Sequence, residues 1–353
     1  MSQILPSTIK AIGLTDPKGN LQLIKAPLKP VGPLDLLVRV EAVSINPVDY
    51  KWVQHMRTQN VSESNPAIFG YDASGVVVQT GSDCKLFKVG DQVIYSGDFT
   101  KLGSNSNYQI VDERLVGKKP QKLTHSEAAA IPLVALTAYE ALVEELDILE
   151  TNKAQNQNKK ILIVGGAGGV GSIAIQIAKK ILGLTVIATA SRAESINFCK
   201  KLGADYVINH YNPLVQELKN LNIESLDYIF NTVDMTQEYF NQFTPLIKPF
   251  GHIVGIVGFE QPLNIQGLFL KRARLSIECM FTRAIFQVEP ERQNQILNKI
   301  SDLYDSGIFI STVQIEKPFN LENLLEAHAF SESGKTIGKA VLSNVQEFFE
   351  KTN

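Results

Sequence analysis

Hydrophobic and polar positions along the chain change their period near residue 124. Before that point, short apolar runs are separated by turn-forming segments rich in Gly, Pro, Asp and Ser, which is typical of a β-rich domain. The clearest runs cover residues 36–43, 73–78 and 92–95. Residues 126–142 then have a helical pattern that Pro132 interrupts or kinks. The polar segment 152–160 predicts a surface loop rather than core.

Beyond this loop, strand patterns alternate with helical ones. Val170, Ile173, Ala174, Ile177 and Ile181 recur at helical spacing, and residues 196–202 form a second helical segment that Gly203 should end. The apolar strand patterns cover residues 161–164, 185–189, 206–208, 228–233 and 253–257. Strands that alternate with helices predict an α/β fold with a doubly wound parallel sheet.

Composition narrows the class of protein without naming a function. The chain has 353 residues and a formal net charge of -2, so we expect neither nucleic acid nor an acidic membrane as a partner. Residues 161–178 carry no charged side chain, but their five glycines favour a turn over a membrane helix. The first residues show no secretory signal, and the three cysteines form no metal knuckle. We therefore expect a cytoplasmic protein that acts on small molecules.

A glycine-rich loop provides the first chemical signal. Gly166, Gly168 and Gly171 form a G-x-G-x-x-G pattern, with Gly169 and Val170 between the last two, directly after an apolar strand and before a helix. In that setting the glycines let the backbone approach a pyrophosphate, which the helix N-terminus then binds. The alternative is a purely structural turn between strand and helix. We expect a dinucleotide site.

The end of the second strand predicts which dinucleotide binds. An NAD site places Asp or Glu there to bind the ribose 2′-hydroxyl, whereas this chain has Ala190, Ser191 and Arg192. A guanidinium suits a phosphate because it donates paired charge-assisted hydrogen bonds. The sequence therefore predicts NADPH. The alternative is that Ser191 only caps the next helix and Arg192 is a solvated charge.

Several motifs then occur in an order that resembles the medium-chain dehydrogenase/reductase superfamily. They are Asn46-Pro47-Val48-Asp49, Gly70-Tyr71-Asp72-Ala73-Ser74-Gly75, Val89-Gly90-Asp91-Gln92-Val93, residues 131–139 (IPLVALTAY), the glycine loop and Gly334-Lys335-Thr336-Ile337-Gly338-Lys339. The resemblance is greatest to its quinone oxidoreductase branch, which includes zeta-crystallin-like and zinc-type alcohol dehydrogenase-like proteins.

This resemblance implies an architecture and further site residues. It implies a GroES-like, β-rich catalytic domain (1–126), an inserted Rossmann domain (127–275) and a C-terminal return to the catalytic domain (276–353). Cofactor contacts are implied at Thr137, His210, Gly255 and Lys339. It also implies a homodimer in which the Rossmann sheets pair edge to edge near residues 275–281.

Relatives that use zinc provide a test of the chemistry. Their catalytic metal is held by Cys and His with a second Cys or an acid, and the corresponding positions here are Asn46, Tyr71 and Leu133. An amide, a phenol and an alkyl chain do not form the donor set that zinc requires. The resemblance, with these replacements, predicts a metal-free site.

Without a Lewis acid, the acceptor must be activated by hydrogen bonds or by its own conjugation, as in a quinone or an α,β-unsaturated carbonyl. Tyr71, Asn46 and Lys51 are the candidate oxyanion donors. Each has an alternative role: Tyr71 as a pocket wall, Asn46 in the turn before Pro47, and Lys51 as a solvated charge. Two other functions stay open, an aldehyde or ketone reductase and a nucleotide-binding structural or regulatory protein.

Overall fold

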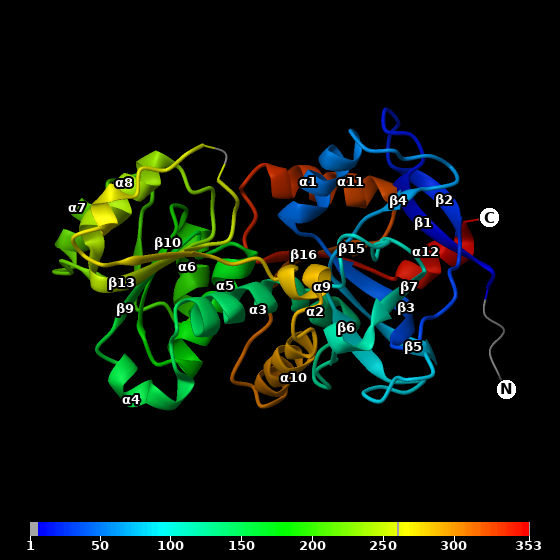
Figure 1. The fold of residues 1–353 in the computed structure, drawn as a ribbon, viewed down its shortest axis with the longest axis horizontal. Coiled ribbons are helices and arrows are strands. Elements are labelled where there is room, and N and C mark those ends of the chain that lie inside the picture. The colour runs from blue at the N-terminus through cyan, green and yellow to red at the C-terminus, as the bar shows by residue number, and fades with distance from the viewer. Residues whose placement is uncertain (1–5, 260, 353) are drawn as a thin grey trace. The chain divides into compact units, whose positions relative to one another are not determined.

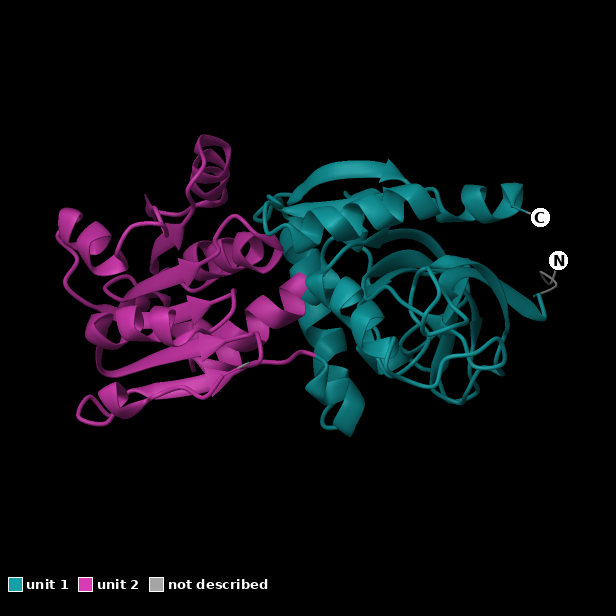
Figure 2. Cartoon of the chain, turned by 90° about the horizontal axis from the view of Figure 1, so that it is seen from above, with its two compact units in different colours: residues 1–133, 281–353 teal, residues 134–280 magenta. Residues whose placement is uncertain are grey.

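The structure is a computed structural model that describes residues 6–259 and 261–352. The chain forms two compact units: unit 1 comprises residues 1–133 and 281–353, and unit 2 comprises residues 134–280 (Figure 2). The sequence placed the two boundaries earlier, at 126/127 and 275/276. The first boundary moves because helix α2 (His125–Ala129) packs against strands β3 (Asp35–Ser44) and β5 (Ala73–Thr80) of unit 1.

Unit 1 is built on two sheets. A three-stranded antiparallel sheet has the order β2-β1-β4, and a larger sheet has the order β15-β16-β3-β5-β6-β8, with β7 also paired to β3 (Figure 1). The remaining strands are β1 (Thr8–Leu14), β2 (Gln22–Pro27), β4 (Ala67–Ile68), β6 (Gln92–Tyr95), β7 (Tyr108–Asp112), β8 (Val116–Lys118), β15 (Val313–Pro318) and β16 (Lys339–Ser343). Strand β16 runs antiparallel to β3, with Val341 opposite Ser44. The C-terminal segment thus completes the sheet that the N-terminal segment begins.

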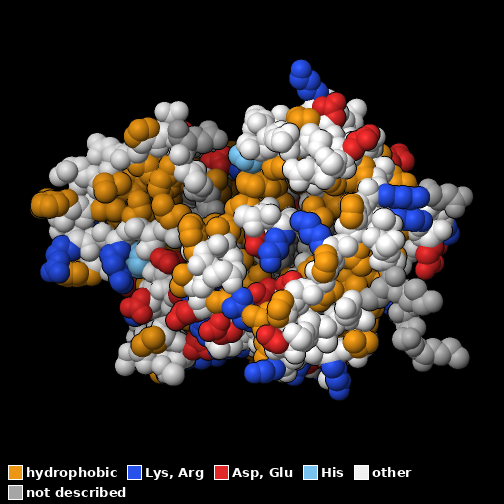
Figure 3. Space-filling model, turned by 45° about the vertical axis from the view of Figure 1, so that its right-hand side comes forward, with side chains coloured by type: hydrophobic (Ala, Val, Ile, Leu, Met, Phe, Trp, Pro, Cys, Tyr) orange, Lys and Arg blue, Asp and Glu red, His pale blue; other side chains and the backbone are white. Residues whose placement is uncertain are grey.

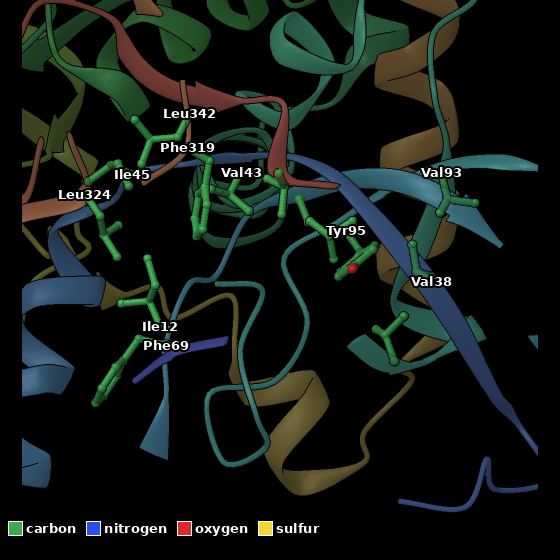
Figure 4. Packing of buried hydrophobic residues seen from close by; sticks show 14 of the residues in the cluster. Ile12, Val38, Val43, Ile45, Phe69, Val93, Tyr95, Phe319, Leu324 and Leu342 are labelled. Carbon is green, nitrogen blue, oxygen red and sulfur yellow. The ribbon is translucent and has the colours of Figure 1, made fainter. Parts of the chain in front are cut away.

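The core of unit 1 lies between these sheets and its helices. Figure 4 shows Ile12, Val43 and Phe69 from the N-terminal segment together with Phe319 and Leu342 from the C-terminal one. All five side chains are almost fully buried, and burial of such groups stabilises the fold by about 1.5–3 kcal/mol each. The helices of this unit are α1 (Pro47–Met56), α2, α9 (Thr282–Phe286), α10 (Glu291–Asp305), α11 (Leu321–Glu332) and α12 (Val345–Lys351).

Unit 2 contains a six-stranded sheet in the order β11-β10-β9-β12-β13-β14, and every pair in it is parallel. Its strands are β9 (Lys160–Val164), β10 (Thr185–Thr189), β11 (Tyr206–Ile208), β12 (Leu226–Asn231), β13 (Ile247–Gly255) and β14 (Arg274–Ile277). Numbered within the unit, this is the 3-2-1-4-5-6 order of dinucleotide-binding sheets. The predicted fold class, a GroES-like domain with a Rossmann sheet, is confirmed.

The helices of unit 2 cover the sheet with apolar side chains. Phe240 and Phe243 pack in one cluster with Leu162 and Ile229 of the central strands. The helix that the sequence predicts at residues 196–202 lies within α6 and ends as predicted at Gly203, which has φ +116°. The helices are α3 (Pro132–Tyr139), which carries the chain from unit 1 into unit 2, α4 (Lys153–Asn156), α5 (Gly169–Gln176), α6 (Ala193–Leu202), α7 (Leu214–Asn220) and α8 (Gln237–Leu246).

One sequence expectation is confirmed here and another is corrected. The helical pattern at residues 126–142 is interrupted at Pro132, as predicted: α2 ends before α3 begins at Pro132, and a π-helical turn, Glu140–Glu145, follows. The polar segment 152–160 is not all loop, because it contains α4. Asn156 at the end of α4 is buried and donates to the carbonyls of Leu149 and Leu182 at 3.1 and 3.0 Å, so this polar residue has an internal role.

No helix within the described ranges is both long and apolar enough to span a bilayer. The uncharged segment 161–178 consists of most of β9, the glycine loop and the start of the following helical segment. On the face shown in Figure 3, basic and acidic side chains lie among one another.

Candidate functional site

The glycine loop of unit 2 joins β9 to α5. Gly165 has φ +75°, a left-handed conformation that favours glycine. A Cβ on Gly171 would lie 2.3 Å from the carbonyl oxygen of Gly165, so this position also requires glycine. The two constraints bring the first turn of α5 against the end of β9.

The start of α5 has the geometry of an anion site. Gly168 is the N-cap, and the first backbone bond of the helix runs from Ser172 N–H to Gly168 O at 2.9 Å. Gly169, Val170 and Gly171 therefore precede the first residue whose N–H is bonded within the helix. A Cβ on Gly168 would meet only the Gly165 oxygen, at 3.3 Å, so the space in front of the helix is open. Its backbone and dipole fit a pyrophosphate.

This loop also lies at the point where the strand order reverses. Strand β9 pairs with β10 on one side and with β12 on the other, and chain order reverses between these neighbours. Dinucleotides bind outside the carboxyl ends of the strands at such a point. Thr232, which follows β12, donates from Oγ1 to the Val164 carbonyl at 2.7 Å and joins the ends of β12 and β9. The structure therefore supports a dinucleotide as the ligand of unit 2.

The end of β10 carries the residues that would distinguish NADPH from NADH. Arg192, not Ser191, is the N-cap of α6, so the alternative role of Ser191 as the helix cap is wrong. The Arg192 backbone N–H donates to Ser195 Oγ at 3.1 Å, which anchors the start of the helix. Ser191 is half-buried and Arg192 is exposed, and no acid occupies residues 190–192. The polar and basic character of this edge fits a 2′-phosphate.

The other cofactor residues predicted in unit 2 lie in different surroundings. His210 follows β11, packs at 4.6 Å from the Tyr211 ring, and has no hydrogen-bond partner for Nδ1 among the described residues. Burial lowers the pKa of His210, which favours a neutral ring. Gly255 is the buried last residue of β13, and Thr137 is 5% exposed on α3. Their contacts with a nucleotide stay predictions.

A buried polar network occupies unit 1 where the three zinc-ligand positions were expected. Lys339 Nζ donates to Asn46 Oδ1 at 2.5 Å, to the Ile45 carbonyl at 2.8 Å and to Asp72 Oδ2 at 3.2 Å. Asn46 Nδ2 donates to Asp72 Oδ2 at 2.8 Å, and the Leu133 N–H donates to Asp72 Oδ1 at 2.8 Å. Asp72 and Lys339 thus hold together the segments that carry Asn46, Tyr71 and Leu133.

This network bears on two predicted site residues. Asn46 is 1% exposed, and its amide oxygen and nitrogen both have partners within the network. Lys339 is 2% exposed, and its ammonium has three internal acceptors. The contact of Asn46 with the acceptor and that of Lys339 with the nucleotide stay predictions. To make its contact, each side chain would have to exchange an internal hydrogen bond for a hydrogen bond to the ligand. Sequence reasoning had named Asp72 only as part of a motif.

Helix α1 explains why Asn46 sits where it does. Asn46 is the N-cap, Pro47 stands in the first turn, and the Asn46 backbone N–H donates to Asp49 Oδ2 at 2.7 Å. Asp49 is fully buried, and burial raises the pKa of its carboxyl to about 7, although the Asn46 bond and Lys339 act in the opposite direction. Lys51 lies on the exposed side of the same helix. The turn before Pro47 is thus a helix cap that fixes Asn46.

Tyr71 lies at one end of a row of aromatic rings in unit 1. Its ring is 5.8 Å from that of Phe281 in an edge-on arrangement, and Phe281 is 4.8 Å from Phe99. Trp52 continues the row at 4.5 Å from Phe99, and His55 stacks on Trp52 at 4.5 Å. Such rings offer apolar faces and edges to a planar ligand. Sequence reasoning missed Trp52, Phe99 and Phe281, because no spacing relates the three.

The Tyr71 hydroxyl is a proton-bearing group at neutral pH. Burial raises the pKa of Tyr71, and the carboxylates of Asp49 and Asp98 raise it further. No hydrogen bond of this hydroxyl occurs within the described part of the chain. A phenol that keeps its proton and has no internal acceptor is suited to donate a hydrogen bond to a carbonyl or a developing oxyanion.

The same positions do not fit a catalytic zinc. Asn46 and Asp72 belong to the network of Lys339, and Tyr71 and Leu133 supply a phenol and an alkyl chain. No group of three or more His, Cys, Asp or Glu side chains able to hold a metal occurs in residues 6–259 or 261–352. An ammonium next to these positions also repels a divalent cation. The donor chemistry therefore disagrees with zinc at this place.

Comparison with known proteins agrees with this architecture. The alcohol dehydrogenase GroES-like domain family matches residues 32–121, and the zinc-binding dehydrogenase family matches residues 169–295. Fold and site define an oxidoreductase of two-domain architecture. The chain belongs to the medium-chain dehydrogenase/reductase superfamily. The family name refers to zinc, but the residues described above do not provide its catalytic ligands.

Individual relatives cover almost the whole chain. A zinc-type alcohol dehydrogenase-like protein of Staphylococcus aureus is 41% identical over 342 residues, which are 95% of this chain and 100% of the relative. A mitochondrial NAD(P)H oxidoreductase of Danio rerio is 30% identical over 339 residues, 89% and 85% of the two chains. The quinone oxidoreductase structure from Coxiella burnetii superposes with a TM-score of 0.76 at 28% identity and covers 95% and 99% of the two chains.

Proposed function

We propose that this chain is an NADPH-dependent reductase of quinones or α,β-unsaturated carbonyl compounds and works without catalytic zinc. The observation that carries the proposal is the Lys339–Asp72–Asn46 network at the expected metal position, combined with an open glycine cradle at α5. The NAD(P)H oxidoreductase and quinone oxidoreductase described above support the reaction class.

Binding of the cofactor falls to unit 2. The N–H groups at the start of α5 would bind the pyrophosphate, and Ser191 with Arg192 would bind the 2′-phosphate. Reduced NADP supplies the hydride once it is bound. His210 would contact the adenosine side, and it would do so as a neutral ring because burial lowers its pKa.

Activation of the acceptor falls to unit 1. The Tyr71 hydroxyl would donate a hydrogen bond to the acceptor oxygen and stabilise the negative charge that develops there. Phe281, Phe99 and Trp52 give a planar, conjugated acceptor apolar surface beside that donor. Conjugation delocalises the developing negative charge, and a simple ketone lacks this stabilisation.

A substrate panel tests this proposal. Purified protein should oxidise NADPH with ortho- and para-quinones or enones, should show little oxidation of simple alcohols with NADP⁺, and should keep its rate after chelation. Gly171→Ala is the matched control, because a Cβ there would lie 2.3 Å from the Gly165 oxygen and close the nucleotide loop. Fast alcohol oxidation that depends on zinc would identify an alcohol dehydrogenase instead. Tight NADPH binding without turnover on any acceptor would identify a binding protein.

We also propose a homodimer formed through β14, which is an edge strand of the unit 2 sheet. The strand leaves Ile277 55% exposed, and pairing with a second copy would bury this edge. Light scattering at micromolar concentration should give twice the mass of 39.0 kDa. A mass of one chain would contradict the dimer without affecting the proposed reaction.

A further inference from the structure

A cavity lies within unit 1, and its lining includes none of Asn46, Asp72 and Lys339. It has a volume of about 530 Å³ and is formed where α1 and α11 lie side by side (Figure 1). The turn between β1 and β2 closes one edge with Asn20 and Leu21. Nothing in the proposed reductase chemistry uses this cavity.

Both helices turn one stripe of side chains toward the cavity. Along α1 and its C-cap residue, the lining residues Tyr50, Val53, Gln54 and Arg57 lie three, four and seven positions on from the first. On α11 the lining residues Leu321, Leu325 and His328 follow four and then three. Residues at this spacing share one face of a helix. The walls are therefore mainly apolar, with polar atoms at a few positions.

His328 places an unused hydrogen-bonding atom in this apolar wall. The side chain is 7% exposed, and its Nε2 atom has no hydrogen-bond partner within the described residues. Burial lowers the pKa of His328 to about 4, so the ring is neutral at physiological pH. A buried polar atom without a hydrogen-bond partner destabilises the fold, and a ligand oxygen would remove that cost.

Arg57 supplies the one charge among the residues that line the cavity. Its Nη1 donates to the carbonyls of Gly19 and Pro17 at 2.8 and 3.2 Å, which fixes the guanidinium beside the β1–β2 turn. The remaining N–H groups of Arg57 have no acceptor in the part of the chain that the structure describes. A guanidinium with spare paired donors is complementary to a carboxylate.

We propose that this cavity binds a small amphiphilic carboxylate. The apolar body of the ligand lies between α1 and α11, its carboxylate pairs with Arg57, and one uncharged oxygen on the ligand hydrogen-bonds to His328. The wall that α11 provides rises about 10 Å from Leu321 to His328, so an extended chain of roughly eight carbons matches the length of this wall. Carboxylates of about that length, with a hydroxyl or carbonyl oxygen, are therefore the expected ligand class.

Calorimetric titration of the full chain with four eight-carbon probes tests the proposal. Octanoate should bind, octanol should bind roughly 10-fold more weakly or worse, and octylamine should not bind, because only the carboxylate complements Arg57. The ω-hydroxy derivative of octanoate should bind about 3- to 10-fold more tightly than octanoate, because its hydroxyl reaches His328. Equal affinity for octanoate, octanol and octylamine, or no octanoate binding at millimolar concentration, would overturn the proposal.

Variants at Arg57 and His328, with their controls, assign the contacts. Arg57→Gln should remove the preference for octanoate over octanol, whereas Lys18→Gln, which removes an exposed charge of the same turn, should leave it unchanged. His328→Leu should abolish the gain from the ω-hydroxyl while octanoate still binds. Because Nε2 has no internal partner, His328→Leu should not lower thermal stability, and His328→Gln should restore part of the gain. Retention of the full hydroxyl gain in His328→Leu would show that His328 does not contact the ligand.

Discussion

The Lys339 ammonium lies 3.2 Å from Asp72 Oδ2, and the two side chains are 2% and 0% exposed. Strands β3 and β16 pair directly, so residues from the two ends of the sequence meet in one sheet. The pair holds Asn46 on one side and the backbone of Leu133 on the other. A buried ion pair therefore joins the segments that a metal ion joins in zinc-using relatives.

Removal of one partner of this pair should destabilise unit 1. Lys339→Met leaves the Asp72 carboxylate buried without its cation, and we expect a loss of about 3–5 kcal/mol in the free energy of unfolding. The double variant Lys339→Met/Asp72→Asn should regain much of that loss, because no buried charge is left unpaired. Urea unfolding followed by fluorescence of Trp52, the sole tryptophan and a residue of unit 1, measures both. A double variant as unstable as the single one would show that the charge pair is not the cause.

Arg192→Ala should weaken NADPH binding by about 1.5–3 kcal/mol if its hydrogen bonds to the 2′-phosphate are lost. NADH binding should barely change, because NADH lacks that phosphate. Fluorescence titration of both cofactors gives the comparison, and Lys200→Ala, at an exposed position of the same helix, is the matched control. Equal losses for the two cofactors would remove Arg192 from the phosphate site.

Tyr71→Phe keeps the aromatic row and deletes one donor. We expect the rate of quinone or enone reduction to fall roughly 10- to 1000-fold with unchanged cofactor affinity. Tyr95→Phe is the matched control, since Tyr95 is also buried and its hydroxyl has no partner among the described residues. If Tyr71→Phe is as active as the parent, Tyr71 is only a wall of the aromatic row.

Ionisation of Asp49 should make the free energy of unfolding depend on pH, and Asp49→Asn should remove this dependence. Its folded-state pKa of about 7 exceeds the ordinary value of 3.8, so between these values the folded chain binds a proton that the unfolded chain does not. This contribution is present below pH 4 and is lost as pH rises toward 7. Urea unfolding of parent and variant from pH 4 to 8 should show a difference that grows with pH in favour of Asp49→Asn.

The contribution of Asp49 must be measured as the difference between parent and variant, because other buried groups also make the free energy of unfolding depend on pH. Burial also raises the pKa of Asp72 and Glu278, which adds to the same trend. Burial lowers the pKa of His125, His252 and His328 to about 4, and these groups make stability rise with pH between 4 and 6.5. A parent and variant whose stabilities differ by a constant amount at every pH would show that Asp49 does not titrate in this range.

Local patterns were sufficient for much of unit 2. The strand at 185–189 and the helix stop at Gly203 follow from short-range requirements: a continuous run of residues that can be buried, and a residue that accepts positive φ. The glycine loop follows in the same way, because the tight turn and the close approach at Gly171 both require the absence of Cβ. A single stretch of sequence contains all the information for such features.

Local patterns were insufficient where a partner lies far away along the chain. The polar segment 152–160 reads as solvated, yet Asn156 is buried because the carbonyl of Leu182 accepts from it. The first boundary between the units likewise depends on the strands that α2 packs against. The residues of α2 do not by themselves specify these strands.

The sequence by itself determined the class of fold and the glycine loop, and with the family resemblance it predicted a site without zinc ligands, since each depends on residue type at neighbouring or motif positions. Only the tertiary structure decided that Lys339 meets Asp72 and Asn46 and that Tyr71 stands at the end of an aromatic row. The physical reason is that a buried ion pair or a ring contact forms only when a residue from a distant part of the sequence lies next to it in the folded chain. In the sequence, Asp72 and Lys339 are 267 positions apart.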